Sequence, residues 1–311
     1  MNQNRAAAID FGSNSSRLLI AEYDNKEINV IYQDLIITRL AKSIDENKAL
    51  DLDSINKTIQ AVKDFNVKMK AFNVKKYKTA GTSALRDANN SDEFIKLLKE
   101  ETGINLDIIS GNKEAQLTYS GATFDTDNND SVIIDIGGGS TEFIEREEGT
   151  HKEVSLDMGA VRFTERFIDE PNSKISKTNQ AKIISEATKY LQKYFKANSK
   201  KEFIGVGGTI TTLAAIDKEL VSFKPEKIEG YILESANVRN IIKNLSNMVI
   251  DEREKVKGLQ KERADIIIAG SLILEAILEF FSAGHIKVSN KDLLYGLIME
   301  IFEDDLYNLF D

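Results

Sequence analysis

Two short stretches of the chain each place an acidic residue before a turn that is rich in glycine and serine. The first runs from Asp10 to Ser15 and the second from Asp135 to Ser140. Small residues leave the backbone N–H groups of a turn open to a bound anion, because no side chain blocks the approach. The aspartate at the start of each turn can hold Mg²⁺, directly or through water, beside that anion. The two stretches therefore predict a site for a phosphate chain and its magnesium ion.

A third glycine-rich turn, Gly205–Thr209, lies between a strand-like segment and a helix-like segment. The N-terminus of a helix attracts negative charge, so this turn predicts contact with a further phosphate group. The residues expected to bind phosphate through the three turns are Gly12, Ser13, Asn14, Ser15, Gly137, Gly138, Gly139, Ser140, Gly207, Gly208 and Thr209. One such turn alone is more often only structural, and it is the series of three that favours a phosphate clamp.

The elements that must position these turns are indicated by the periodicity of the apolar residues. Alternation predicts strands, and spacings of three and four residues predict helices. In the first part of the chain we expect strands over Arg5–Phe11, Ser16–Tyr23, Ile28–Thr38, Lys76–Gly81 and Asn105–Ser110, and helices over Asp51–Phe72 and Ser91–Thr102.

The second part of the chain shows a similar succession of patterns. We expect strands over Ser131–Gly137, Thr141–Glu147, His151–Asp157 and Phe203–Gly207, and helices over Ser176–Lys196 and Thr209–Ile216. The aromatic residues Tyr190, Tyr194 and Phe195 are expected in the core. From about Ser235 onward the pattern is mostly helical, and the apolar run Ile266–Phe281 is expected to be buried.

An internal repeat supports this assignment. The pattern I-D-x-G-x-x-S recurs at an offset of 125 residues (135 − 10), and a Gly-Thr pair that ends a strand recurs at an offset of 127 (208 − 81). Duplication of a βββαβα unit explains both offsets. We place the domain boundary in the polar run Asp125–Asp130, which gives an N-terminal domain over 1–124 and a second domain over 125–296.

Composition excludes several kinds of site. The 311 residues contain no cysteine and only two histidines, so thiolate nucleophiles, Cys-ligated metals and His-rich metal sites are excluded or improbable. The net charge of −9 argues against nucleic acid and membrane as partners. No stretch approaches the about 20 apolar residues of a membrane helix, and the N-terminus lacks a signal-peptide pattern, so we expect a cytoplasmic protein.

Longer strings around these motifs resemble those of a known family. They read AAAIDFGSNSSRLLIAE, TAGTSALRDA, IISGNKEAQLTYSGA, VIIDIGGGSTEFI, LDMGAVRFTERF, IGVGGTITTLAAI and ERADIIIAGSLILEAI. In this order they are similar to the exopolyphosphatase/guanosine pentaphosphate phosphohydrolase (Ppx/GppA) family, in its short two-domain form. The resemblance implies an α/β fold with two ribonuclease-H-like domains of the actin and sugar-kinase superfamily flanking a cleft. It also implies that the last helix, about 297–311, packs back on the first domain.

The resemblance also assigns roles to residues. Glu114 matches the family's general base, and Asp10 and Asp135 match its metal-organising aspartates. Glu142 is a candidate third metal ligand, although alternation leaves open whether it faces the cleft. Arg17 and Arg86 match basic residues that neutralise phosphate oxygens. Lys113 departs from the family pattern, which has a glutamate there. A neighbouring ammonium would weaken Glu114 as a base, but adjacent residues on a helix point about 100° apart, which leaves open that Lys113 faces solvent instead.

The resemblance implies a phosphoanhydride hydrolase that uses Mg²⁺ and releases terminal orthophosphate. Its substrate is inorganic polyphosphate, the 5′ phosphate of pppGpp, or both, and the sequence leaves this choice open. Two other functions also stay open, a non-catalytic ppGpp or polyphosphate sensor and a sugar-kinase-like phosphotransferase. Similar proteins form dimers, so the resemblance allows a homodimer.

Overall fold

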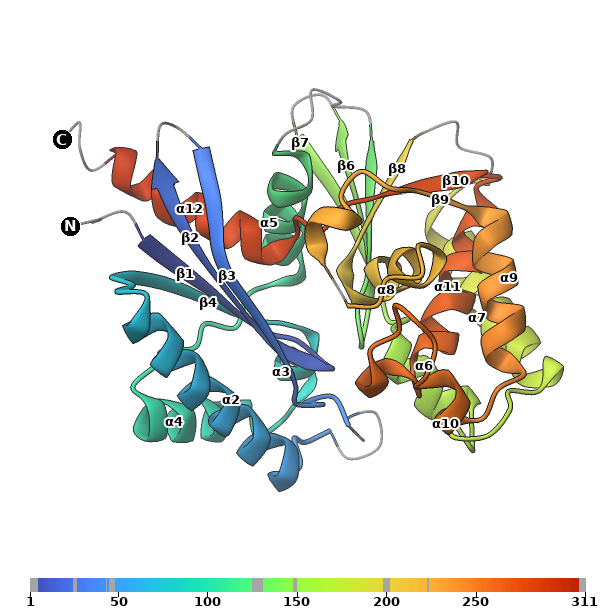
Figure 1. Ribbon diagram of the computed structural model, residues 1–311, viewed down its shortest axis with the longest axis horizontal. Helices are drawn as coiled ribbons and strands as arrows, with labels where there is room; N and C mark the ends of the chain where they lie inside the picture. Colours follow the sequence, from blue (N-terminus) through green and yellow to red (C-terminus); the bar gives the residue numbers. More distant parts are fainter. Residues whose placement is uncertain are drawn as a thin grey trace. The chain divides into compact units, whose positions relative to one another are not determined.

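The structure is a computed structural model, and it describes residues 5–24, 27–42, 44, 48–124, 131–147, 150–197, 202–222 and 224–307. It has the expected α/β fold, built on two mixed β-sheets. The chain divides into two compact units, shown in Figure 1. Unit 1 comprises Met1–Phe124 and Lys291–Asp311, and unit 2 comprises Asp125–Asn290. The expected boundary segment Asp125–Asp130 lies outside the described residues.

Unit 1 contains a four-stranded sheet in the order β3-β2-β1-β4. Strand β1 pairs antiparallel with β2 and parallel with β4. The strands are β1 (Arg5–Phe11), β2 (Ser15–Asp24), β3 (Glu27–Ile37) and β4 (Lys76–Gly81). The helices are α2 (Leu52–Ala71), α3 (Ser83–Asp87), α4 (Ser91–Thr102), α5 (Gly111–Thr123) and α12 (Leu293–Tyr307).

Helices cover both faces of this sheet. Helices α2 and α4 lie on one face, and α5 and α12 lie on the other (Figure 1). Ala6 and Ala8 of β1 pack with residues of α12 in one buried cluster. Because successive side chains of a strand point to opposite faces, Asp10 lies on the α12 face as well. The C-terminal helix, which begins at Leu293 rather than at the expected 297, is thus part of the same layer as the first acidic motif.

Helices α5 and α12 approach each other through two glycines. A Cβ atom at Gly121 would lie 2.3 Å from the carbonyl oxygen of Asp292, and one at Gly296 would lie 2.1 Å from the carbonyl oxygen of Leu117. Both neighbours are backbone atoms, which cannot move aside like the end of a flexible side chain. The close approach of the two helices therefore requires glycine at both positions.

Unit 2 contains a six-stranded sheet in the order β7-β6-β5-β8-β10-β9. Its strands are β5 (Val132–Ile136), β6 (Thr141–Glu147), β7 (Thr150–Leu156), β8 (Phe203–Val206), β9 (Ile232–Glu234) and β10 (His285–Val288). Its α-helices are α6 (Ala160–Phe167), α7 (Lys177–Tyr194), α8 (Gly207–Asp217), α9 (Ser235–Ser246), α10 (Ile250–Arg253) and α11 (Ile267–Phe280). Two short 3₁₀ helices are η1 (Pro225–Lys227) and η2 (Lys261–Arg263).

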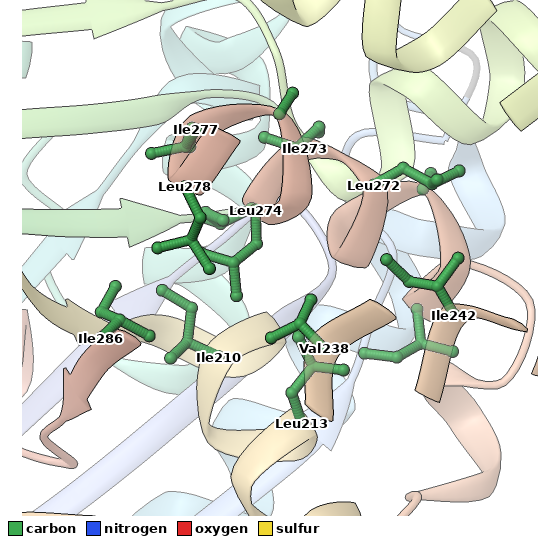
Figure 2. Close-up of a cluster of buried hydrophobic side chains, with 14 of the residues drawn as sticks. Ile210, Leu213, Val238, Ile242, Leu272, Ile273, Leu274, Ile277, Leu278 and Ile286 are labelled. Carbon is green, nitrogen blue, oxygen red and sulfur yellow. The ribbon is translucent and has the colours of Figure 1, made fainter. Parts of the chain in front are cut away.

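The core of unit 2 is built around helix α11. As expected, its residues are almost all buried. Figure 2 shows apolar side chains of α8, α9, α11 and β10 gathered in one cluster, including Ile210, Val238, Leu274 and Ile286. This cluster fixes the start of α8, which carries the third glycine-rich turn.

The predicted duplication is confirmed by the strand pairing. Strand β5 pairs antiparallel with β6 and parallel with β8, as β1 does with β2 and β4. The orders β3-β2-β1-β4 and β7-β6-β5-β8 are therefore equivalent, and β10 and β9 extend only the second sheet.

The strand expected over Asn105–Ser110 is wrong. This segment makes only an isolated parallel bridge, between Ile108 and Gly81. The hydroxyl of Thr79 donates to the carbonyl of Asn105 and accepts from the N–H of Asp107, at 3.0 Å each. The side chain thus takes the backbone groups that would otherwise extend a ladder.

The prediction that Tyr190, Tyr194 and Phe195 lie in the core is correct for two of the three residues. Tyr190 and Phe195 pack against the core of unit 2, whereas the side chain of Tyr194 is 49% exposed. Helix α7 ends at Tyr194, which lies beside the ammonium of Lys193.

None of the helices in the described ranges is both long enough and apolar enough to span a bilayer.

We expect Gly296→Ala to lower the free energy of unfolding by about 2 kcal/mol, because the added methyl group overlaps the α5 backbone. Urea unfolding followed by circular dichroism measures this. Gly284→Ala is the matched control, since a Cβ there meets nothing within 4 Å. Equal stability of the two variants would contradict the close packing of α5 and α12.

Candidate functional site

The first glycine- and serine-rich turn joins β1 to β2 and is closed by a bond from the Gly12 N–H to the Ser15 carbonyl, 3.0 Å long. The carbonyls of Ser13 and Asn14 accept from backbone N–H groups of residues 38, 39 and 41, at 2.9–3.1 Å. Within the described ranges, the N–H groups of Ser13 and Asn14 donate to no acceptor. The turn therefore directs its carbonyls into unit 1 and leaves the N–H groups of Ser13 and Asn14 available to an acceptor outside the described ranges.

The second turn, between β5 and β6, repeats this arrangement in unit 2. The Gly137 N–H donates to the Ser140 carbonyl, again at 3.0 Å. The carbonyls of Gly137 and Gly138 accept from the first N–H groups of α6 at 2.9–3.1 Å. The N–H groups of Gly138 and Gly139 have no acceptor in the part of the chain that the structure describes. Both predicted turns thus offer unused backbone donors.

The third turn brings two distant side chains to the start of α8. Gly207 has a φ of +80°, and a Cβ there would lie 2.1 Å from Oδ1 of Asp135. A Cβ at Gly208 would lie 2.1 Å from Nη1 of Arg263. The side chain of Thr209 instead packs against Gly270 of α11. Asp135 and the guanidinium of Arg263 therefore lie against the first backbone groups of this helix.

The acidic residue of the first motif, Asp10, is directly opposite Arg17 on β2. Its Oδ2 accepts from Nε of Arg17 at 2.8 Å and lies 2.7 Å from Nη2. Its Oδ1 is buried and has no hydrogen-bond partner within the described chain. Burial raises the pKa of Asp10 above its ordinary value, while the charge of Arg17 acts to lower that pKa. One oxygen of Asp10 is therefore held and the other is open.

The equivalent pair in unit 2 has two acids. Asp135 is opposite Glu142, so both side chains lie on the same face of the sheet. Glu142 is buried, only 3% exposed, and accepts a hydrogen bond of 2.9 Å from Ser155 Oγ. The sequence left open which way Glu142 faces. The structure places Glu142 on the same face as Asp135, where it is buried and does not face solvent.

These acids suit a cation that is shared with phosphate. Among the described residues, no three acidic or histidine side chains gather closely enough to form a metal cage. Mg²⁺ is commonly held by only one or two carboxylates together with phosphate oxygens. The open Oδ1 of Asp10, and the facing carboxylates of Asp135 and Glu142, are each compatible with that mode of binding.

The general base expected from the sequence, Glu114, lies in the first turn of α5. Its Oε2 accepts from Nη1 of Arg86 at 2.7 Å, and the same nitrogen donates to the Ile109 carbonyl at 3.1 Å. The Glu114 side chain is 12% exposed. Burial raises the pKa of Glu114, and the negative charge of Asp10 raises it as well. The positive charges of Arg86 and Arg17 act to lower the pKa of Glu114. Glu114 is therefore a buried carboxyl group that pairs with Arg86 and lies within electrostatic reach of Asp10 and Arg17.

Lys113 points to a different partner. Its Nζ forms an ion pair with Glu300 of α12, which also accepts from Lys78 Nζ at 3.1 Å. The charges that act on the Glu114 carboxyl are those of Arg86, Asp10 and Arg17. The Lys113 ammonium therefore pairs with Glu300 of α12 and not with Glu114, the expected base.

The structure therefore gathers the predicted residues in two groups. Unit 1 holds the first turn, Asp10, Arg17, Arg86 and Glu114, and unit 2 holds the second and third turns with Asp135 and Glu142.

Within unit 1, both polar atoms of the Asn14 side-chain amide are buried without a partner among the described residues. An unpartnered buried amide in the turn is a second indication that a polar ligand binds there.

Sequence reasoning gave no role to two arginines that the structure places at the turns. Arg162 Nε donates to the carbonyl of Gly139 at 2.7 Å, and Arg263 packs on Gly208. Both are buried and both lie within strings that carry the family resemblance. Asp292, which pairs with Arg17, lies in none of those strings, so the sequence held no signal for it.

Comparison with known proteins shows similarity to a phosphatase family. A model of the Ppx/GppA phosphatase family matches residues 19–304. The bifunctional 3-dehydroquinate synthase/phosphatase of Fusobacterium nucleatum is 36% identical over 316 residues, which cover 96% of this chain and 46% of that protein. The chain thus spans about half the length of this relative.

Two further proteins match over nearly their whole length. Exopolyphosphatase 2 of Mycobacterium tuberculosis is 26% identical over 317 residues, which cover 97% of this chain and 99% of that protein. The crystal structure of the Aquifex aeolicus Ppx/GppA family member has a TM-score of 0.80 and 29% identity, with 97% of this chain and 98% of that chain covered.

We expect Arg86→Gln to raise the pKa of Glu114 further, because burial then acts without the nearest positive charge. Carbon-13 NMR of the glutamate carboxyls measures this, with the Glu114 signal identified by its absence from Glu114→Gln. Arg5→Gln is the control, since Arg5 pairs with Glu22 instead. An unchanged or lower pKa in Arg86→Gln would contradict the assigned geometry.

Proposed function

The chain belongs to the Ppx/GppA phosphatase family, and on that basis we propose that it hydrolyses terminal phosphoanhydride bonds. The substrates we propose are inorganic polyphosphate and the 5′ phosphate of pppGpp. The observation that carries this proposal is the buried Glu114, held by Arg86 in the same unit as a turn with unused N–H donors. The name of the M. tuberculosis relative, an exopolyphosphatase, supports the choice of polyphosphate.

In the proposed reaction, Glu114 accepts a proton from a water molecule as that water attacks the terminal phosphorus. A new P–O bond forms to the water oxygen, and the bond from phosphorus to the bridging oxygen breaks. Orthophosphate leaves, and the shortened chain keeps the bridging oxygen. The raised pKa of Glu114 suits this role, because a carboxylate with a higher pKa is a stronger base.

Backbone donors hold the phosphate chain in this proposal. In each unit, the N–H groups of its own glycine- and serine-rich turn would bind phosphate oxygens and oppose their negative charge. The start of α8 at Gly207–Thr209 would bind a further phosphate group. Arg86 uses Nη1 for Glu114, and its Nη2 has no acceptor within the described residues, so Nη2 is free to donate to a phosphate oxygen.

Divalent-metal chemistry is part of the proposal. Asp10 in unit 1 and the Asp135–Glu142 pair in unit 2 are the residues that would hold Mg²⁺, for the reasons given above. When bound, the cation would neutralise negative charge on the phosphate oxygens. Carboxylate and phosphate oxygens are hard ligands, which Mg²⁺ prefers. The chain has no cysteine, so it has no thiolate, the soft ligand that other metals prefer.

A paired substrate assay tests this function. The purified chain is incubated with Mg²⁺ and with pppGpp or polyphosphate of two lengths, and released orthophosphate is measured. We expect release from at least one substrate, with no acceptor molecule added. Binding without release would instead indicate a sensor, and phosphate transfer that requires an added hydroxyl acceptor would indicate a phosphotransferase.

Replacing the proposed base should separate chemistry from binding. We expect Glu114→Gln to lower kcat by at least about 100-fold with substrate affinity nearly unchanged, because the amide cannot accept the proton. Phosphate release and equilibrium binding of the substrate are measured on the same preparation. Glu101→Gln is the control, since Glu101 is an exposed residue that pairs with Lys63. Wild-type rates in Glu114→Gln would refute the role of Glu114.

A further inference from the structure

Arg17 is held between two carboxylates from distant parts of the chain. Its Nε and Nη2 engage Oδ2 of Asp10, and its Nη1 engages Oδ2 of Asp292. All three guanidinium nitrogens therefore have carboxylate partners. The three side chains lie in unit 1, with Asp10 and Asp292 6% and 8% exposed and Arg17 21% exposed.

Asp292 has a separate function for each of its oxygens. It immediately precedes α12, and its Oδ1 accepts from the N–H of Leu294 at 3.1 Å, which caps the helix. Its Oδ2 takes Nη1 of Arg17. One side chain thus fixes the start of α12 and one edge of a guanidinium that in turn holds Asp10.

The planar guanidinium passes this constraint on to Asp10. Its donors have a fixed fork geometry, so a guanidinium anchored at Nη1 presents Nε and Nη2 in a set direction. Those two donors take the same oxygen of Asp10, Oδ2, and leave Oδ1 open. Without the anchor at Nη1, Arg17 could turn about its side-chain torsions, and the Asp10 carboxylate could turn with it.

We propose that Asp292 is a positioning residue, which acts through Arg17 to hold the open oxygen of Asp10 in its reactive orientation. This assigns Arg17 to the support of Asp10 rather than to direct contact with phosphate. The test by kcat rests on the proposed function, because it requires phosphate release. The test by NMR hydrogen exchange requires no substrate and does not rest on that function.

Helix capping alone does not explain Asp292. Asparagine and serine cap helices about as well as aspartate and bring no charge. A buried carboxylate costs free energy unless it is paired, and the charge of Asp292 also raises the pKa of Asp10. The carboxylate is therefore explained by its pairing with Arg17.

Asp292→Asn separates the two functions. The amide oxygen still caps α12, whereas the amide N–H group faces the N–H donors of Arg17 and cannot pair with them. We expect kcat for phosphate release to decrease about tenfold, with KM changed by less than about twofold. Asp51→Asn is the matched control, because Asp51 caps α2 through Asp53 and Ser54. It should retain the wild-type kcat.

A double-mutant cycle with Arg17→Gln tests whether Asp292 acts through Arg17. We expect the double variant to have about the kcat of Arg17→Gln alone. Multiplicative losses in the double variant, or a wild-type kcat in Asp292→Asn, would overturn the inference. If the wild-type protein releases no phosphate from any substrate, the proposed function fails and the spectroscopic measurement below decides the inference.

The Arg17 Nε–H signal in nitrogen-15 NMR provides this measurement without substrate. It is identified by its absence from Arg17→Gln. We expect slow hydrogen exchange of this group in the wild type and in Asp51→Asn, and exchange at least about tenfold faster in Asp292→Asn. Equal exchange in all three proteins would overturn the inference.

Discussion

In both units, backbone hydrogen bonds take up the carbonyl oxygens of the glycine- and serine-rich turn. The donors come from the segment that follows the third strand of the repeat, residues 38–41 in unit 1 and the start of α6 in unit 2. Because the carbonyls are bound inside each unit, the turn can present N–H groups to an anion without an opposing row of oxygens. The proposed phosphate contacts depend on this constraint, which is made mainly by backbone groups, with Arg162 taking the carbonyl of Gly139 in the second turn.

The two copies of the motif differ in how the charge of the aspartate is balanced. Arg17 and Glu142 occupy equivalent positions, each opposite the aspartate of its own hairpin. In unit 1 the guanidinium supplies a positive charge from the chain itself. In unit 2 the residue opposite the aspartate is a second carboxylate, Glu142. The duplicated units have thus diverged at the position that sets the local charge.

Local features of the fold were predictable, and features made by distant residues were not. Alternation and the repeat gave the strands around both turns, because burial on a sheet determines that pattern directly. The segment Asn105–Ser110 has a strand-like pattern, but the Thr79 hydroxyl takes its backbone groups. The strand β10 was missed because it lies outside the repeat. The resemblance singled out Glu114, whose role as a base stays a prediction. The contact between Arg17 and Asp292 spans 275 residues and has no local pattern.

Unit 1 is discontinuous in sequence, and this affects the order in which the protein can fold during synthesis. Its helix α12 covers Ala6, Ala8 and Leu19 of the sheet, and it leaves the ribosome only after the whole of unit 2. Unit 2 is continuous and can therefore complete its core first. Until α12 emerges, the nascent unit 1 exposes an apolar sheet face that is prone to aggregation. A truncation immediately before Leu293 would make that exposure permanent.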